Sequence, residues 1–318
     1  MSRAIDVART LIAQGQAELP LPGKGDTGRR WRELIELGRK DLTAARLVEA
    51  HADASAICAD LEVEDCPDRA SLWGVWAAEP PTPVLEAVQH GGVWKLRGTK
   101  LWCSAAGFAT HALVTAQHSG RSRLFSVDLR QAGVTAGEKT WASSGMAETE
   151  TAPMHFDGVS AVPAGDPDSY LDRPGFWHGG LGVACCWWGG AQGLIDMFCE
   201  KARRRDDPHT LAHLGACLAW DETITNALTS AAQEIDANPG NLPAARRRAL
   251  SLRSVVERGC ADVIRRFGKA LGASPLAEDH DAARLVQDLQ VYIRQSHAEA
   301  DDAQLARYVL ATEDGRRR

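Results

Sequence analysis

The 318-residue sequence has no long apolar run and no excess of positive charge. No segment approaches the uninterrupted apolar length that a membrane-spanning helix needs, and residues 1–13 carry charged side chains without a continuous apolar core. The formal charge at pH 7 is −6, and the arginine runs at 246–248 and 316–318 are too short to reverse it. We therefore expect a soluble, cytoplasmic protein with no membrane partner and no nucleic-acid partner.

Metal-ligand and cofactor motifs are also missing. The eight cysteines include no Cys-x-x-Cys pair and no neighbouring Cys/His set at metal-ligand spacing. This pattern predicts buried free thiols in a reducing compartment and no metal site. The chain has no glycine-rich dinucleotide motif after a strand, no phosphate loop and no nucleophile elbow. These absences exclude most other classes of cofactor enzyme.

The N-terminal part of the chain has a helical pattern. Residues 4–15 have apolar side chains at helical spacing, and prolines and glycines within residues 20–28 then interrupt the chain. A second helix is predicted from about Arg29 to Leu61, because its apolar side chains can form one buried stripe.

From Ser71 to about Pro163 the pattern changes to alternating apolar residues separated by turn residues. Six or seven short strands in this stretch predict a small barrel or sandwich. Gly98 and Thr99 are predicted to form the turn of a hairpin between residues 93–97 and 100–104. The other predicted strands are residues 72–77, 111–115, 123–128, 139–143 and 152–156.

After Pro174 and Gly175 the chain has a helical pattern to its end. Four long amphipathic helices with short connections predict an antiparallel four-helix bundle. Glycines 189 and 190, next to Cys185 and Cys186, predict a close helix-packing or subunit-contact surface. The apolar positions of the four helices run from Val183 to Phe198, from Leu211 to Ile235, from Leu252 to Leu271 and from Leu285 to Leu305.

The predicted fold class is α+β and mostly α. Residues 1–70 form the predicted N-terminal helical domain, and residues 71–165 form a small central β-barrel or sandwich. Residues 175–312 form the predicted C-terminal antiparallel four-helix bundle.

Several stretches, taken in this order, resemble motifs of the acyl-CoA dehydrogenase superfamily of flavoproteins. Leu96–Ala105 is similar to the family's Gly-x-Lys strand and its flavin-facing Trp-Ile-Thr strand, and Trp76–Pro80 stands at its Thr-Glu strand. The resemblance covers most of the chain and implies a divergent member with a shortened N-terminal helical domain. Further similar stretches are residues 145–159, the turn Lys269–Ala273, and Arg284 with Asp288, which match the family's Arg-x-x-x-Asp.

The resemblance implies FAD as the cofactor, in a cleft between the β-domain and the bundle. The family's Gly-Ser-Asp element, which holds the pyrophosphate, is replaced here by Pro80–Val84. Among Arg203, Arg204 and Arg205, Arg205 is assigned as the arginine that reaches a cofactor across a subunit interface, which implies a homodimer or homotetramer. A charged helix end before a proline is the alternative interpretation. The residues implied to bind the cofactor are Trp76, Ala77, Ala78, Trp102, Cys103, Ser104 and Arg205.

The catalytic carboxylate of the family has no counterpart at its usual place. Eight residues after Asp288 stands Ser296, followed by His297, and the alternative place around residues 178–180 also lacks a carboxylate. Ser296 and His297 are therefore the candidate catalytic residues, with Glu299 as a carboxylate that could take over the role. A packed or exposed histidine without a catalytic role is the alternative for His297.

These residues leave three functions open. The first is an FAD-dependent oxidoreductase of acyl-CoA dehydrogenase type that acts on an acyl thioester or a related small substrate. The second is a flavin-dependent monooxygenase, because relatives with that activity use histidine or serine in this neighbourhood and lack the carboxylate. The third is a non-catalytic relative that acts as a binding or assembly partner.

Overall fold

The computed structural model describes residues 2–205 and 207–316, which divide into two compact units. Unit 1 contains the described residues up to Leu21, with Thr43–Ser143 and Ala147–Phe176. Unit 2 contains Pro22–Leu42, Ser144–Met146 and the described residues from Trp177 onward. The chain therefore passes between the units several times. None of the described helices is long and apolar enough to cross a membrane.

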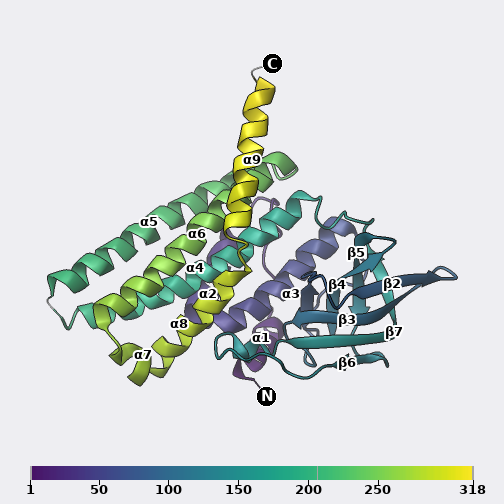
Figure 1. Ribbon diagram of the computed structural model, residues 1–318, viewed down its shortest axis with the longest axis horizontal. Helices are drawn as coiled ribbons and strands as arrows, with labels where there is room; N and C mark the ends of the chain where they lie inside the picture. Colours follow the sequence, from purple (N-terminus) through teal and green to yellow (C-terminus); the bar gives the residue numbers. More distant parts are fainter. Residues whose placement is uncertain (1, 206, 317–318) are drawn as a thin grey trace. The chain divides into compact units, whose positions relative to one another are not determined.

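Unit 1 is built from the β-domain and two N-terminal helices (Figure 1). The helices are α1 (Arg3–Ala13) and α3 (Leu42–Leu61), and a short 3-10 helix, η1, covers Ala147–Thr149. The strands are β1 (Trp73–Trp76), β2 (Leu85–His90), β3 (Val93–Cys103), β4 (His111–His118), β5 (Arg121–Asp128), β6 (Val134–Ala136) and β7 (Ala152–Ala164).

Five of these strands form a closed ring. β4 pairs with β2, β2 with β3, β3 with β7, β7 with β5, and β5 with β4 again, while β1 joins β4 and β6 joins β7. Closure removes free sheet edges around the ring. The predicted α+β fold, mostly helical with a small central barrel, is confirmed.

The predicted hairpin turn at Gly98 and Thr99 is wrong. β3 runs through both residues, and the turn lies instead at Gly91 and Gly92, where His90 pairs with Val93. The two glycines have φ of 57° and 85°, as a tight two-residue hairpin turn requires. Gly98 has φ 121°, and a Cβ there would lie 2.5 Å from the Val84 carbonyl oxygen. Gly98 is thus a point where two strands approach closely, near an irregularity in the pairing with β7. A glycine in the sequence is typical both of such a point and of a turn, so it did not distinguish between them.

The barrel core and the contact with α3 are both apolar. Inside the ring, Trp94, Leu96, Phe125 and Phe156 belong to one buried cluster. On the outside of the ring, Ile57 and Cys58 of α3 pack with Trp73, Leu113 and Leu124. Burial of these apolar side chains, which contributes about 25 cal/mol per Å² of apolar surface removed from water, holds α3 on the barrel.

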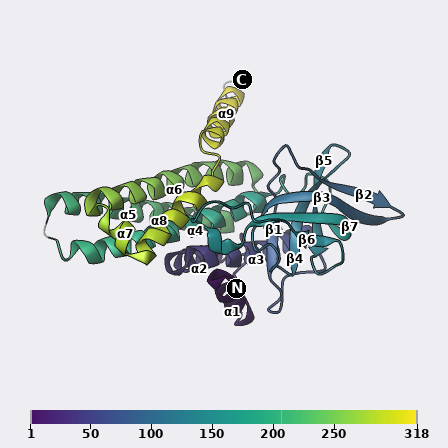
Figure 2. The same ribbon diagram turned by 60° about the horizontal axis from the view of Figure 1, so that its bottom comes forward.

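Unit 2 is helical, and α9 points away from its other helices in both views (Figures 1 and 2). Its predicted bundle is formed by α4, α5, α6 and α8. The elements are α2 (Thr27–Lys40), α4 (Pro174–Ala202), α5 (Pro208–Ala237), α6 (Leu242–Leu271), α7 (Ser274–Glu278), α8 (His280–Tyr292), the 3-10 helix η2 (Ile293–Gln295) and α9 (Glu299–Arg316).

Small residues let α2 and α4 approach closely. A Cβ at Gly189 would lie 2.2 Å from the Ile35 carbonyl oxygen, and one at Gly38 would lie 2.5 Å from the Cys186 carbonyl oxygen. The predicted packing surface at Cys185–Gly190 is therefore a close helix contact inside this unit. Any side chain larger than hydrogen at Gly189 would push the two helices apart.

Three further element predictions need correction. The predicted helix over 29–61 is two helices, because Asp41 has an extended backbone (φ −155°, ψ 102°). The predicted fourth bundle helix ends at Tyr292, and α9 begins anew at Glu299. Residues 139–143 form no strand, since their alternating side chains find no neighbouring strand to pair with. In each case the spacing of apolar residues fitted the predicted helix or strand. The backbone conformation or the absence of a pairing strand determined which element forms.

Asp288 holds a crossing segment of chain on α8. Its carboxylate is 3% exposed and accepts a hydrogen bond from the Met146 backbone N–H at 2.6 Å. Arg284 lies beside it, with Nε 3.4 Å from Asp288 Oδ2 and Nη2 3.2 Å from Asp41 Oδ1. Burial raises the pKa of Asp288, while the Met146 N–H and Arg284 oppose that shift. The Arg-x-x-x-Asp pair therefore has a structural role here.

We expect Asp288→Ala to lower the free energy of unfolding by about 3 kcal/mol, because it leaves a buried N–H and a guanidinium without their carboxylate. Urea unfolding followed by circular dichroism measures the loss. Asp281→Ala, at an exposed position of the same helix, is the matched control with an expected change below about 0.5 kcal/mol. Equal losses in the two variants would contradict the assignment.

Candidate functional site

The first predicted flavin-facing stretch, residues 76–78, follows strand β1. β1 pairs in parallel with β4, with Trp76 opposite Val114. The Trp76 indole is buried, and its Nε1 donates to the Ser104 carbonyl oxygen at 3.1 Å. Gly74 leaves room for this ring, because a Cβ there would lie 2.5 Å from Trp76 Nε1. This hydrogen bond brings the first stretch to the second one, residues 102–104.

Trp102 is presented outward at the end of β3. Its pairing with β7 shifts register between Lys100 and Cys103, and Trp102 itself has φ 56°. A left-handed backbone at a bulky residue costs on the order of 1 kcal/mol and is concentrated at functional sites. The side chain is 57% exposed, although it is one of the largest apolar groups in the chain. An exposed indole held in this way is available to stack on a flat ligand.

The other predicted cofactor residues of this unit differ in what they expose. The Cys103 side chain is fully buried in the barrel core, and burial raises the pKa of its thiol, so only its backbone can face a ligand. The Trp76 side chain is buried in the same core. Ala77 is half-buried and Ala78 is exposed. Prediction from the motif assigned these positions without separating side chains that face the core from those that face outward.

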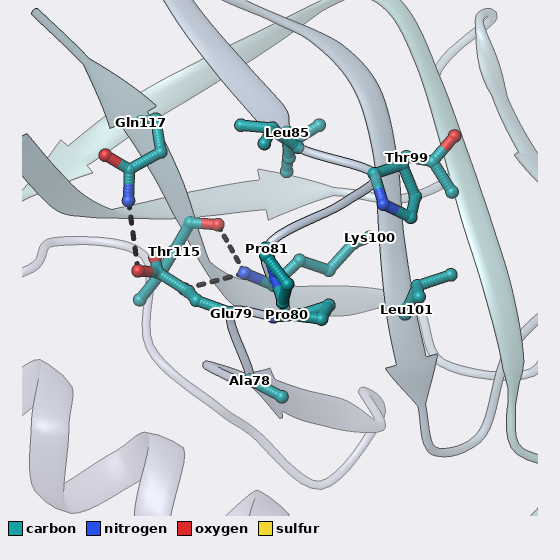
Figure 3. A pocket seen from close by; sticks show the side chains of 12 residues that line it. Ala78, Glu79, Pro80, Pro81, Leu85, Thr99, Lys100, Leu101, Thr115 and Gln117 are labelled. Atoms are coloured by element: carbon teal, nitrogen blue, oxygen red, sulfur yellow. Dashed lines mark hydrogen bonds between the residues drawn. The ribbon is translucent and has the colours of Figure 1, made fainter. Parts of the chain in front are cut away.

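A pocket of about 260 Å³ adjoins this stretch and contains Ala78 in its lining (Figure 3). Lys100 lies at its inner side, and its Nζ donates to both the carbonyl oxygen and the Oγ1 of Thr115, each at 2.7 Å. Glu79 accepts from Gln117 Nε2 at 3.0 Å and from Ser122 at 2.7 Å. The full lining is Ala78, Glu79, Pro80, Pro81, Pro83, Val84, Leu85, Thr99, Lys100, Leu101, Thr115 and Gln117.

Burial disfavours the charged form of Lys100. The side chain is 4% exposed, and burial lowers the pKa of Lys100 to about 8, which the nearby Glu79 partly opposes. The two bonds to Thr115 satisfy two of the three ammonium protons. The sequence prediction placed Lys100 in a motif but did not identify it as a buried amine, although its two-residue alternation with Trp94 and Leu96 was an available signal.

The predicted catalytic residues of unit 2 lie in the turn between η2 and α9. The Ser296 hydroxyl oxygen accepts from the Ala298 N–H at 3.2 Å, and Ala298 has φ 45°. The His297 side chain is 80% exposed, and its Nδ1 lies 3.5 Å from Asp301 Oδ1, while its backbone N–H donates to Asp301 Oδ2 at 3.3 Å. Glu299 is exposed in the first turn of α9, where a carboxylate is favourable to the helix dipole.

Helix α6 anchors this turn. Arg253 donates to the Gln295 carbonyl oxygen at 3.1 Å and to the Gly180 carbonyl oxygen at 2.6 Å, and its guanidinium lies over the Trp187 ring. Ser254 donates to Asp302 at 2.7 Å. Further ion pairs join Arg258 to Asp302 and Arg294 to Glu257.

The sequence prediction missed both Arg253 and Asp301. The one signal available in the sequence was the four-residue spacing of His297 and Asp301, which places them on one face of a helix.

His178, at the alternative place for the family's base, and the predicted cofactor residue Arg205 have local structural roles. His178 is buried, and its Nε2 lies 3.1 Å from the Pro239 carbonyl oxygen, which fits a packed histidine. Arg205 is exposed beyond the end of α4, and its N–H donates to the Ala202 carbonyl oxygen at 3.0 Å. Asp207 after it caps α5 through a bond from the Thr210 N–H. Arg205 therefore stands at a helix end, as the alternative interpretation has it, and its cofactor role stays a prediction.

The carboxylates and metal-ligand groups limit the chemistry. Among the described side chains of unit 2, Asp288 is the single buried carboxylate, and its oxygens are engaged by Met146 and Arg284. No group of three or more His, Cys, Asp or Glu side chains within the described residues could hold a metal ion. The ionisable groups at the predicted catalytic turn are thus His297, the exposed Glu299 and the partly buried Asp301.

A comparison with protein families matches part of the barrel. Residues 77–159 match the family model for the acyl-CoA dehydrogenase middle domain. A search of curated protein sequences gave no match. The matched stretch includes most of the barrel strands together with Trp102 and Lys100.

Solved structures share the fold over nearly the whole chain. Dibenzothiophene monooxygenase (TdsC) from Paenibacillus sp. A11-2 superposes with a TM-score of 0.78 at 18% identity, covering 98% of this chain and 97% of that one. KijD3, in complex with FMN and a dTDP-linked amino sugar, has a TM-score of 0.78 at 19% identity and coverages of 98% and 86%. Butyryl-CoA dehydrogenase from Megasphaera elsdenii has a TM-score of 0.76 at 18% identity and coverages of 88% and 81%.

We expect the buried amine to make stability depend on pH. The folded pKa of Lys100, about 8, is below the unfolded value of 10.5, so the unfolded chain binds more protons between these values. Relative to Lys100→Met, the wild type should therefore gain up to about 3 kcal/mol of unfolding free energy as the pH rises from 8 to 10.5.

Urea unfolding of both proteins across this pH range measures the difference. Lys95→Met, at an exposed position of the same strand, is the matched control and should show no such trend. A constant difference between wild type and Lys100→Met would show that Lys100 keeps an ordinary pKa.

Proposed function

We propose, from the premise that this chain is a divergent member of the acyl-CoA dehydrogenase superfamily, that it is a flavin-dependent monooxygenase. The observation that carries the proposal is the replacement of the family's base by Ser296 and His297 in a turn that offers no buried carboxylate. Abstraction of an α-proton by a carboxylate, which a dehydrogenase of this family needs, has no suitable group there. Oxygen activation by a reduced flavin needs no such base.

The residues of unit 1 fit a flavin ring. Trp102 offers an exposed aromatic face, and the bond from Trp76 to the Ser104 carbonyl oxygen fixes the two flavin-facing stretches to each other. The backbone of residues 76–78 and 102–104 would hold the ring edge. A bound flavin supplies the redox chemistry, and the protein supplies binding and orientation.

FMN fits this chain better than FAD does. The segment that stands at the family's pyrophosphate element contains Pro80, Pro81 and Pro83, none of which has a backbone N–H to donate to a phosphate. FMN is bound in structures of TdsC and KijD3, which share the fold. FAD, which the family resemblance implied, becomes the competing outcome of the binding test below.

His297 is the proposed acid–base group of unit 2. The carboxylate of Asp301 lies 3.5 Å from Nδ1, so it orients the exposed ring. Arg253 is a positioning residue for the turn, through its bond to the Gln295 carbonyl oxygen. The substrate class stays open, and so does the predicted assembly as a homodimer or homotetramer.

Two alternatives remain as outcomes of the tests. A dehydrogenase acting on an acyl thioester would require Glu299 as base, but this carboxylate is exposed at the start of α9. A non-catalytic binding partner would bind no flavin at all.

We expect the purified protein to bind FMN more tightly than FAD, measured by quenching of flavin fluorescence. Trp102→Ala should weaken FMN binding about tenfold, because stacking on an aromatic side chain contributes on the order of 1–3 kcal/mol. Trp102→Phe keeps an aromatic face and should retain most of the affinity. Absence of binding to either flavin would exclude both enzyme hypotheses. Anaerobic bleaching of the bound flavin by butyryl-CoA would establish the dehydrogenase instead.

We expect His297→Ala to slow the air reoxidation of bound, photoreduced FMN by about a hundredfold, because general acid–base catalysis contributes a factor of this order. Stopped-flow absorbance measures the rate, and the FMN dissociation constant should stay unchanged. His280→Ala, at an exposed histidine on α8, is the matched control and should reoxidise at the wild-type rate. An unchanged rate in His297→Ala would return this residue to a structural role in the turn.

A further inference from the structure

The end of α3 brings two cysteines of unit 1 together. Glu62 adopts a left-handed conformation (φ 53°), and the Val63 N–H donates to the Cys58 carbonyl oxygen at 3.0 Å. This is the hydrogen bond that closes a helix C-terminus with a reversal of the chain. Because the chain reverses, Cys66 returns to the last turn of the helix, where Cys58 lies.

The two thiols are direct neighbours. Cys58 Sγ lies 3.8 Å from the carbonyl oxygen of Asp65, the residue that precedes Cys66. The Cys66 thiol donates to the Val63 carbonyl oxygen at 2.9 Å, and the Val63 N–H is bonded to the Cys58 carbonyl oxygen, so both thiols lie at the same helix end. The sulfurs are therefore close without a bond between them.

The two cysteines differ in access to solvent. Cys58 is 1% exposed and packs against Trp73 and Leu113, whereas Cys66 is exposed. The expectation that all eight thiols are buried is therefore wrong at Cys66. Of the other cysteines, Cys199 is half-buried and the rest are buried. A soluble oxidant meets Cys66 first.

We propose that Cys66 and Cys58 form a redox modification site, at which hydrogen peroxide converts the two thiols into an intrachain disulfide. In the first step the Cys66 thiol gives up its proton, and the thiolate attacks one peroxide oxygen. The O–O bond breaks, Cys66 becomes a sulfenic acid, and the leaving hydroxide takes up that proton to form water. In the second step Cys58 Sγ attacks the Cys66 sulfur, the S–O bond breaks, and the leaving hydroxide takes the Cys58 proton to form a second water. Two thiols and one peroxide thus give one disulfide and two waters.

The division of roles follows from the surroundings of each sulfur. Burial, together with the adjacent Cys66 thiol, raises the pKa of Cys58, which keeps it protonated and unreactive toward peroxide. Cys58 is nevertheless in place as the resolving thiol, and its proximity protects Cys66 from further oxidation. The bond would tie the last turn of α3 to the segment before β1, across a loop that contains the core residue Val63.

The site is tested on the full chain with hydrogen peroxide, followed by alkylation of remaining thiols in denaturant, trypsin digestion and mass spectrometry. Both cysteines fall on the tryptic peptide 47–69, because no Lys or Arg lies between Arg46 and Arg69. We expect this peptide to appear without alkyl groups and lighter by two hydrogens than the reduced form. Dithiothreitol should restore double alkylation. Peroxide should also raise the Tm of the wild type by a few degrees, since the bond closes a loop.

Variants separate this outcome from simple oxidation of an exposed thiol. Cys66→Ser, at an exposed position, should abolish the bridged peptide and the peroxide-dependent rise in Tm. Cys58→Ala should leave Cys66 trapped by dimedone as a sulfenic acid and then oxidised further. Cys199→Ser is the matched control and should form the bridge as the wild type does. Full alkylation of peptide 47–69 after peroxide, or sulfinic acid at Cys66 with Cys58 alkylated in the wild type, would overturn the proposal.

Discussion

Backbone pairing of β3 on both sides is the constraint on which unit 1 depends. The strand pairs with β2 along one edge and with β7 along the other, and this double pairing holds the barrel ring together. Within it, the strand cannot keep a regular register, and the shift between Lys100 and Cys103 sends neighbouring side chains to unlike environments. Lys100 keeps the inward alternation of Trp94 and Leu96 and lies beside Thr115, whereas Trp102, within the shifted stretch, is exposed. The outward indole is thus a consequence of the bulge.

The elements of the fold could be predicted where local pattern and tertiary packing agree. Helices α4, α5 and α6 followed from apolar spacing, because each buries one face in unit 2. Gly98 could not be assigned from spacing, since a glycine marks either a turn or a close backbone contact. The helix break at Asp41 could not be predicted from apolar spacing either. The Asp41 carboxylate accepts a hydrogen bond from Arg284, which is far away in sequence.

The candidate site could be predicted only as a set of positions. The resemblance located residues 76–78, 102–104 and 296–299, but it could not tell which side chains are buried. Trp76 and Cys103 face the core while Trp102 faces outward, and the bulge in β3 sets the contrast between Trp102 and Cys103. Arg253 was outside any motif because its role depends on reaching the carbonyl oxygens of Gly180 and Gln295, which tertiary structure alone brings within reach.

The charges around the turn before α9 bear on position 296, where the family resemblance predicts a carboxylate and this chain has a serine. The first turn of α9 already contains Glu299, Asp301 and Asp302. Asp302 is paired with Arg258, and Asp301 lies beside His297. A carboxylate at position 296 would add a further negative charge to this group, and like charges within a few ångströms raise one another's pKa and oppose ionisation. The serine at position 296 adds no charge to the acidic start of α9, which is consistent with this charge arrangement.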